Sequence, residues 1–305
     1  MNILNDRNFK MKLLKVLFFL IPSVLFAQET APNFLSYRYN MNLINPAYAG
    51  AEESGALNIG FRKESYGLKD NPVTQLFSYS KNAKAYGKNI GLGIAVINDK
   101  TFITRQTDFT IDISYKLQMN AATNLYFGLK AGGAMYKIDF NSLEVNDPLF
   151  SENISTFSPL VGVGVYLKGK RYYLNASSPN LLLSDVQQPV MDDGGVFSES
   201  INEKLHLYFG GGYRFTINEN LDITPSVFSR LVTDENVMID ASVLADISEL
   251  IEVGATYRVD TSIIGSVLLK LMDNTHFGYA YESTTSDLGT IASGTHEFFV
   301  RFIFD

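Results

Sequence analysis

The residues best suited to catalysis in this chain are its three histidines, His206, His276 and His296. A hydrolytic serine site needs an imidazole within hydrogen-bond reach of a nucleophile, and an acid that orients the imidazole. The nearest candidate set is His296 with Glu297 and Ser293. Consecutive residues of a strand point to opposite faces, so His296 and Glu297 cannot act together if this segment is a strand. The sequence therefore predicts that the protein is not an enzyme.

Two other segments look like ligand sites but lack the required pattern. The Gly-Gly-Gly run at residues 210–212 has no following Lys-Ser/Thr pair and lies inside a predicted strand, unlike a phosphate-binding loop. The Asp-Asp-Gly-Gly segment at residues 192–195 lacks the spaced oxygen ligands of a calcium loop, so a solvated turn is favoured. The absence of cysteine excludes thiolate metal sites and disulfides, and the net charge of −7 gives no footprint for nucleic acid. We expect no cofactor, no bound metal and no nucleic-acid partner.

Several segments of the chain alternate strictly between apolar and polar residues. If residues 107–117 form an extended strand, its two faces carry different residues. One face has the apolar residues Phe109, Ile111, Ile113, Tyr115 and Leu117, and the other has the polar residues Asp108, Thr110, Asp112, Ser114 and Lys116. One face of such a strand meets an apolar environment and the other meets water. We expect a wet interior lined by acidic residues, namely Asp108, Asp112, Asp240, Asp246 and Glu252.

The alternation recurs to the end of the chain and predicts about fourteen strands. The even-numbered connections between them are all short, whereas the long ones, residues 139–156, 178–203 and 284–294, all fall at odd-numbered positions. A transmembrane barrel sorts its connections in this way, and a β-sandwich does not. The sequence therefore predicts an all-β fold: a single transmembrane antiparallel β-barrel with short periplasmic turns and long extracellular loops. The expected strands are residues 56–66, 73–82, 89–98, 105–117, 124–138, 157–168, 171–177, 204–216, 220–231, 236–246, 251–260, 263–271, 275–283 and 295–304.

The beginning of the chain has the pattern of an export signal. Lys10, Lys12 and Lys15 precede an apolar run that ends at Ala27, and this run is too short to span a bilayer as a helix. We expect a signal peptide over residues 1–27, an N-terminal periplasmic or plug segment over residues 28–55 and the barrel over residues 56–305. Translation could start at the first methionine or at Met11, because the residues from Lys12 onward already form a complete leader.

A distinctive block, Asn-Pro-Ala-Tyr-Ala-Gly, lies outside the predicted strands at residues 45–50. Pro46 stops regular structure, Tyr48 offers an anchor and Gly50 permits a turn toward the first strand. These properties predict that the segment containing Asn45, Pro46, Ala47, Tyr48 and Gly50 plugs or braces the barrel.

This block resembles the N-terminal signature of the PorP/SprF family of type IX secretion system membrane proteins. Other matching blocks follow in order along nearly the whole mature chain, at residues 62–75, 91–99, 147–150, 178–181, 278–282 and 294–297. Similar proteins often carry Trp where this chain has Tyr66. The resemblance implies a non-enzymatic outer-membrane barrel of Bacteroidota-type bacteria that serves the secretion and gliding machinery. Such barrels typically accompany one large secreted surface protein, often an adhesin, and are needed for its export or attachment.

Two functional hypotheses follow. In the first, the long loops dock the C-terminal sorting domain of a secreted surface protein, the periplasmic end faces secretion and gliding components, and outer-membrane lipid surrounds the barrel. Exposed apolar residues on loops mark binding surfaces, and those expected to contact the partner are Leu149, Phe150, Leu181, Leu182, Val186, Met191 and Phe197. In the second, the barrel is an outer-membrane channel or uptake barrel for small or hydrophobic solutes, because a lumen of this size can hold a ligand.

Overall fold

The computed structural model describes residues 34–52, 54–64, 71–85, 87–140, 153–182, 185–192, 195–202, 204–233, 236–285 and 294–304. Side chains are not described for residue 85 or for residues 185–192 and 195–202. The signal peptide expected over residues 1–27 lies outside the described part of the chain.

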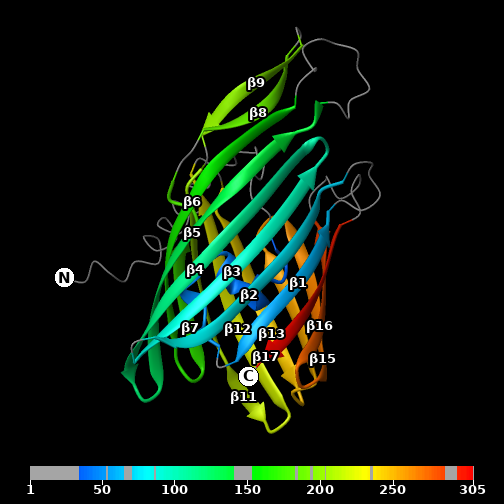
Figure 1. Cartoon of the computed structure of the whole chain (residues 1–305). Helices are drawn as coiled ribbons and strands as arrows, with labels where there is room; N and C mark the ends of the chain where they lie inside the picture. Colours follow the sequence, from blue (N-terminus) through cyan, green and yellow to red (C-terminus); the bar gives the residue numbers. More distant parts are fainter. Residues whose placement is uncertain are drawn as a thin grey trace, which may run out of the picture. The chain divides into compact units, whose positions relative to one another are not determined.

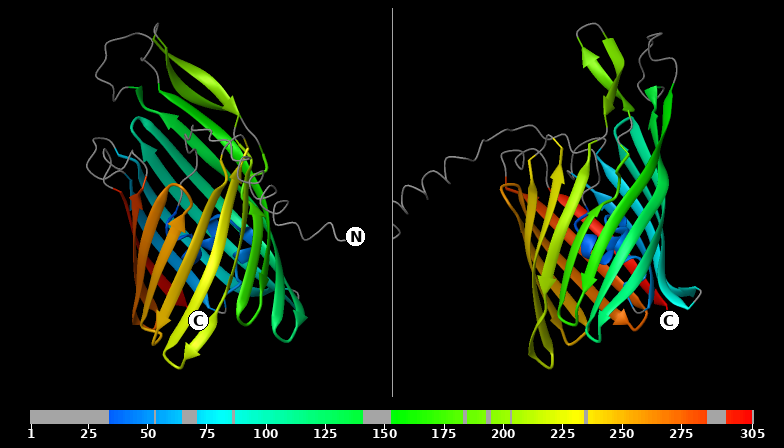
Figure 2. Two further views of the ribbon diagram at one scale, coloured as in Figure 1. Left: turned by 180° about the vertical axis from the view of Figure 1, so that it is seen from behind. Right: turned by 90° about the vertical axis from the view of Figure 1, so that its left-hand side faces the viewer.

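The described chain forms a closed antiparallel β-barrel, shown in Figures 1 and 2. Strands that are adjacent around the ring are antiparallel, and the first and last strands pair with each other, with Gly55 opposite Phe304. The strands are β1 (Gly55–Lys63), β2 (Val73–Ala85), β3 (Lys88–Thr101), β4 (Thr104–Asn120), β5 (Thr123–Ile138), β6 (Ile154–Lys168), β7 (Tyr172–Ser178), β8 (Asp185–Asp192), β9 (Gly195–Asn202), β10 (His206–Tyr213), β11 (Phe215–Asn218), β12 (Leu221–Val232), β13 (Met238–Ile247), β14 (Ile251–Arg258), β15 (Ser262–Met272), β16 (Thr275–Thr284) and β17 (Thr295–Phe304). The predicted fold is confirmed, because all fourteen predicted strands are present in the ring.

Two parts of the sheet differ from the sequence prediction. The strand expected over residues 204–216 is divided into β10 and β11, and both pieces pair with β12. The division falls at Arg214, whose backbone N–H still donates to the carbonyl oxygen of Arg171, the residue before β7, at 2.6 Å. The long connection expected over residues 178–203 contains a two-stranded hairpin, β8–β9, outside the barrel sheet.

The two faces of the barrel wall have opposite chemistry. Large apolar side chains such as Phe109, Ile111 and Ile113 are exposed on the outside, at 46–53 % of their surface. Small and polar residues, including Ser78 and Ser114, are buried on the inside. Lipid provides the apolar surroundings that the outer face requires, so the barrel reverses the arrangement of a soluble protein. Among the described residues, no helix is long and apolar enough to cross a membrane.

Three short 3-10 helices, η1 (Tyr37–Tyr39), η2 (Met41–Leu43) and η3 (Pro46–Tyr48), precede the first strand. They lie within the ring of strands in every view of Figures 1 and 2, where they are coloured blue. Their buried side chains form an apolar cluster together with residues of the wall, including Leu76, Tyr208 and Phe228. We refer to residues 34–52 as the plug.

Candidate functional site

The Asn-Pro-Ala-Tyr-Ala-Gly block of the plug lies directly on the backbone of the barrel wall. A Cβ atom on Gly91 would overlap the carbonyl oxygen of Ala49, and one on Gly128 would overlap the backbone nitrogen of Ala47. A Cβ atom on Gly164 would overlap the side chain of Asn45. These three glycines belong to β3, β5 and β6, so the wall has no side chain at three points where the block lies closest to its backbone.

Asn45 fixes the conformation of the block and its attachment to the wall. Its side-chain oxygen accepts the backbone N–H of Ala47 at 2.9 Å and so caps helix η3, which begins at Pro46. Its side-chain nitrogen donates to the carbonyl oxygen of Val165 on β6 at 3.1 Å. Asn45 is fully buried. Both ends of the amide are therefore satisfied, as burial of a polar side chain requires.

Polar side chains of the wall hold the backbone carbonyl groups of the plug. The Ser114 hydroxyl donates to Ala49 at 2.6 Å, and the Ser177 hydroxyl donates to Ile44 at 2.8 Å. These contacts come from β4 and β7, so different parts of the ring hold the same short segment. Lysines make further contacts of this kind: Lys168 donates to Ala51 at 2.8 Å and Lys130 donates to Asn42 at 3.1 Å.

Lys130 also forms a buried ion pair on the wall. Its Nζ atom lies 2.8 Å from Asp112 on the adjacent strand, and both side chains are almost completely buried. Asp112 was expected to line a wet interior. In the structure it lies inside the barrel, but its partner is a lysine that itself contacts the plug.

The beginning of the plug is held by the opposite wall. The Glu297 carboxylate on β17 accepts the backbone N–H groups of Leu35 at 2.7 Å and Ser36 at 3.1 Å. Arg301, on the same strand, donates to the carbonyl oxygen of Tyr39 at 2.8 Å and pairs with Glu52 at the end of the plug. The plug is therefore tied to both sides of the barrel.

Aromatic contacts complete the attachment. Tyr37 stacks on Phe228 of β12 with ring centroids 4.3 Å apart, and Tyr48 meets Tyr166 of β6 edge to face at 5.1 Å. The Tyr48 hydroxyl donates to Glu52 at 2.7 Å. Burial, together with the charge of Glu52, raises the pKa of Tyr48 well above its usual value. Tyr48 therefore stays a neutral hydrogen-bond donor at physiological pH.

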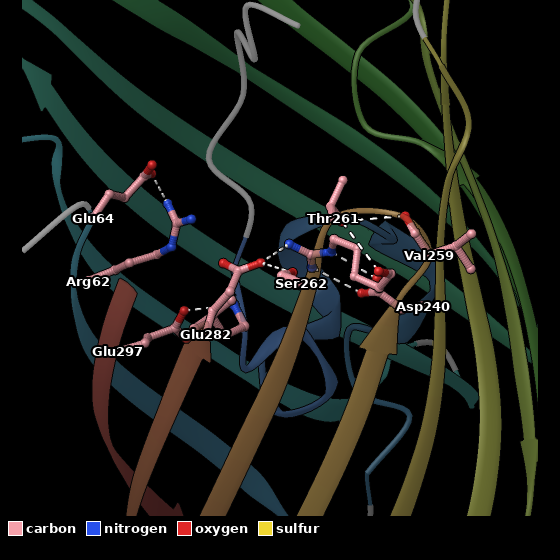
Figure 3. A network of polar contacts seen from close by, with 10 residues as sticks. Arg62, Glu64, Asp240, Val259, Thr261, Ser262, Glu282 and Glu297 are labelled. Atoms are coloured by element: carbon pink, nitrogen blue, oxygen red, sulfur yellow. Dashed lines mark hydrogen bonds and ion pairs between the residues drawn. The ribbon is translucent and has the colours of Figure 1, made fainter. Parts of the chain in front are cut away.

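A network of buried charges lies on the inner wall near the long connections, as Figure 3 shows. Arg258 on β14 donates to both carboxylate oxygens of Asp240 at 2.8 and 3.0 Å, and to Glu282 at 2.8 Å. The Ser262 hydroxyl donates to the same glutamate. This network joins β13, β14, β15 and β16 and satisfies charges that would otherwise destabilise the interior.

Of the candidate catalytic residues, Ser293 lies outside the described residues, and His296 and Glu297 are not brought together. His296 and Glu297 lie on opposite faces of β17, as alternation predicts: Glu297 binds the plug, and the Nδ1 atom of His296 lies 2.9 Å from the Tyr279 hydroxyl. His206 and His276 lie on the separate strands β10 and β16. Within the described ranges, no group of His, Asp and Glu residues could hold a metal ion.

The residues predicted to contact a partner all belong to long connections. Leu181 and Leu182 follow β7, and their side chains are 41 % and 39 % exposed. Three others lie in the hairpin: Val186 and Met191 on β8, and Phe197 on β9. Leu149 and Phe150 lie outside the described residues.

Sequence reasoning did not identify the wall residues that hold the plug. Alternation alone indicates that Lys130 and Arg301 face inward, since each is a charged residue between apolar ones, and Glu297 shares the face of Arg301 four residues away. Their partners depend on the path of the plug, which no periodicity in the sequence specifies.

The barrel is similar in fold to solved outer-membrane proteins. It matches the toluene transporter TbuX of Ralstonia pickettii with a TM-score of 0.52 at 12 % identity, over 86 % of this chain and 92 % of that chain. It matches the monoaromatic hydrocarbon channel CymD with a TM-score of 0.53 at 12 % identity, over 91 % of this chain and 95 % of that chain. At these identities the likeness shows the fold alone. No curated protein sequence matches the chain.

The family comparison covers almost the whole sequence. The family model described as "Type IX secretion system membrane protein PorP/SprF" matches residues 26–302. The closed barrel, its apolar outer face and its fold relatives place the protein in the outer membrane. The chain is thus an outer-membrane β-barrel that belongs to the PorP/SprF family of type IX secretion system membrane proteins.

Proposed function

We propose that this barrel is a sealed docking scaffold that holds a secreted surface protein at the outer face of the outer membrane. The short turns face the periplasm and the periplasmic secretion and gliding components, and the long connections face outward. This placement follows the usual arrangement of bacterial outer-membrane barrels.

The observation that carries the proposal is the plug. It is tied to β4, β5, β6, β7 and β17 by hydrogen bonds, and its central block packs on bare glycine backbone. Opening a path for a solute requires many of these buried contacts to break together. A barrel occupied in this way acts through its surfaces rather than through conduction.

The docking surface is formed by the long connection after β7. The backbone N–H of Leu181 donates to Val161 at 2.7 Å, and that of Leu182 donates to the Asn180 side chain at 3.1 Å. These bonds fix the backbone, so the two leucine side chains are presented to the outside at little further entropic cost. Exposed apolar groups on a fixed loop favour burial by a partner.

The β8–β9 hairpin supports the same surface. A two-stranded hairpin is marginally stable by itself in water, and this one does not join the barrel sheet. A bound protein that covers the hairpin would bury more of its surface and stabilise it. Val186, Met191 and Phe197 are its proposed contact residues.

Affinity purification from the native outer membrane in mild detergent tests this proposal. We expect a large secreted protein to co-purify at near-equal amounts with the intact barrel. Replacing residues 183–203 by a flexible linker should abolish this recovery, whereas replacing residues 286–293 in another long connection should leave it intact. Recovery that survives loss of the hairpin, or a barrel that purifies alone even after cross-linking, contradicts docking at this surface.

A channel for small or hydrophobic solutes is the second candidate, favoured by the fold likeness to a toluene transporter and a monoaromatic hydrocarbon channel. Planar-bilayer recordings and uptake into liposomes separate the two functions. The docking proposal predicts no conductance and no uptake of monoaromatic solutes by the intact barrel. Measurable flux of either kind favours the channel.

A further inference from the structure

Three cations form a row on the outer face of the barrel, near the end that bears the long connections. Lys100 on β3 pairs with Arg105 on β4, and Arg105 pairs with Lys137 on β5. Residues paired across antiparallel strands point to the same face, with Cβ atoms about 5 Å apart. All three are exposed and alternate with the inward-facing residues of their strands. We refer to Lys100, Arg105 and Lys137 as the cation row.

The cation row lies just beyond the surface that contacts lipid. On β4, the exposed apolar side chains run from Phe109 to Met119, and this stretch measures about 34 Å along the strand. At the usual strand tilt of about 40°, this corresponds to about 25 Å along the barrel axis, which is the height of the apolar band of an outer-membrane barrel. Arg105 lies four residues beyond Phe109, or about 10 Å above that band by the same conversion. Charged headgroups occupy this level.

A hollow of about 480 Å³ opens at the row. Lys100, Arg105 and Lys137 all line it. Other lining residues are Phe102, which is 48 % exposed at the tip of the β3–β4 turn, and Ile103, which is buried. Ile103 packs in an apolar cluster with Ile138, Phe140 and Ile154. The site therefore combines three cations with an apolar floor.

The row is electrostatically unfavourable as it stands. Like charges directly opposite each other on paired strands repel. No ion pair among the described residues involves any of the three, and Asp139 is the acidic residue that lines the same hollow. A bound anion with more than one negative charge would relieve the repulsion. Arginine beside lysines is well suited to a phosphate, because its guanidinium can donate two parallel hydrogen bonds.

We propose that the hollow binds the phosphate groups of a phosphorylated glycolipid in the leaflet that surrounds the long-connection end. The acyl chains run down the wall over the next outward side chains, Met135 on β5 and Phe157 on β6, which are 42 % and 65 % exposed. The leaflet assignment rests on the proposed outward placement of the long connections. The site would fix the depth of the barrel in the membrane on the side of the longest strands.

Native mass spectrometry of the purified full-length barrel in detergent tests the site with three probes: bisphosphorylated lipid A, its dephosphorylated form and inorganic phosphate. We expect lipid A to remain bound, and the dephosphorylated form and inorganic phosphate to bind at least tenfold more weakly. The variant K100Q/R105Q/K137Q should lose lipid A affinity at least tenfold. The control K63Q/K81Q/K88Q removes three cations that do not form such a row, and it should bind like the intact barrel.

Heat-modifiable migration on a gel verifies that each variant is folded. Lipid A binding that is unchanged in the cation-row variant, or equally reduced in the control, overturns the proposal. Equal binding of the dephosphorylated lipid overturns phosphate recognition, and equal binding of inorganic phosphate overturns the lipid assignment. Lipid A binding is measured without the secreted partner, so a negative result for this site is distinguishable from a failure of the docking function.

Discussion

At the scale of single residues, the packing of the plug depends on glycines of the barrel wall, which have no side chain. Gly91, Gly128 and Gly164 leave the space on the wall that the backbone and Asn45 of the Asn-Pro-Ala-Tyr-Ala-Gly block fill. In the sequence they look like ordinary interruptions of a strand. Their role becomes visible only when the plug is placed, because the contact joins segments that are far apart in the chain.

A side chain at Gly128 should push the block away from the wall. We expect Gly128→Val to lower the free energy of unfolding by about 1–3 kcal/mol, as overpacking of a filled interior does. Urea unfolding of the barrel in detergent measures this change. Gly265→Val is the matched control, because a Cβ there meets nothing within 4 Å. Equal stability of the two variants would mean that the block does not pack on Gly128.

The Asp112–Lys130 pair makes a second prediction at this scale. Lys130→Met leaves the Asp112 carboxylate buried without its partner at 2.8 Å, and we expect a loss of about 3–5 kcal/mol in unfolding free energy. The double variant Lys130→Met/Asp112→Asn removes the uncompensated charge and should recover more than half of that loss. A double variant as unstable as the single one would show that the charge is not the cause.

This pair also illustrates what sequence can predict. Alternation placed Asp112 on the inner face, and the structure confirms that position. The same alternation could not name Lys130 as its partner, because the pairing depends on the register between β4 and β5. Periodicity fixes the face on which a residue lies, and register fixes its neighbours.

At the scale of elements, the strands of the barrel were predictable, whereas the hairpin outside the barrel and the division of one strand were not. The strand expected over residues 105–117 is present as β4. The hairpin in residues 178–203 was missed, although Asp192 pairs with Gly195 across an intervening Asp-Gly, a dipeptide favoured in tight hairpins. The division at Arg214 was also missed, because the alternation continues across it, with Tyr213 and Phe215 on one face and Arg214 on the other.

At this scale, we predict that the plug closes the lumen of the barrel. Replacing residues 34–52 by a flexible linker should remove the contacts with Glu297, Arg301 and Ser114 and open the lumen. We expect the intact barrel to be silent in a planar bilayer and the variant to conduct ions. Replacing residues 286–293 serves as the control and should leave the barrel silent. A folded plug variant that remains silent would show that other groups close the lumen.

At the scale of the whole molecule, the arrangement follows from one alternation that is kept throughout the ring. The membrane-facing surface is apolar, most polar residues of the wall face inward together with the apolar residues that contact the plug, and pairing of β1 with β17 removes the open edge. The number of strands and the sorting of connections by length were readable from the sequence, because both are regular. The path of the plug through the lumen was not, because its contacts follow no period.

The docking proposal also concerns the whole molecule, since it requires the secreted protein to bind at one end of the barrel and not at the other. The most direct measurement is site-specific photo-cross-linking in growing cells. A photoreactive residue in place of Leu182, at the long-connection end, should yield one adduct with a large secreted protein. The same residue in place of Ala122, in the short turn between β4 and β5, should yield none with that protein. Absence of the adduct at Leu182, or equal adducts at both positions, would contradict docking at the long-connection end.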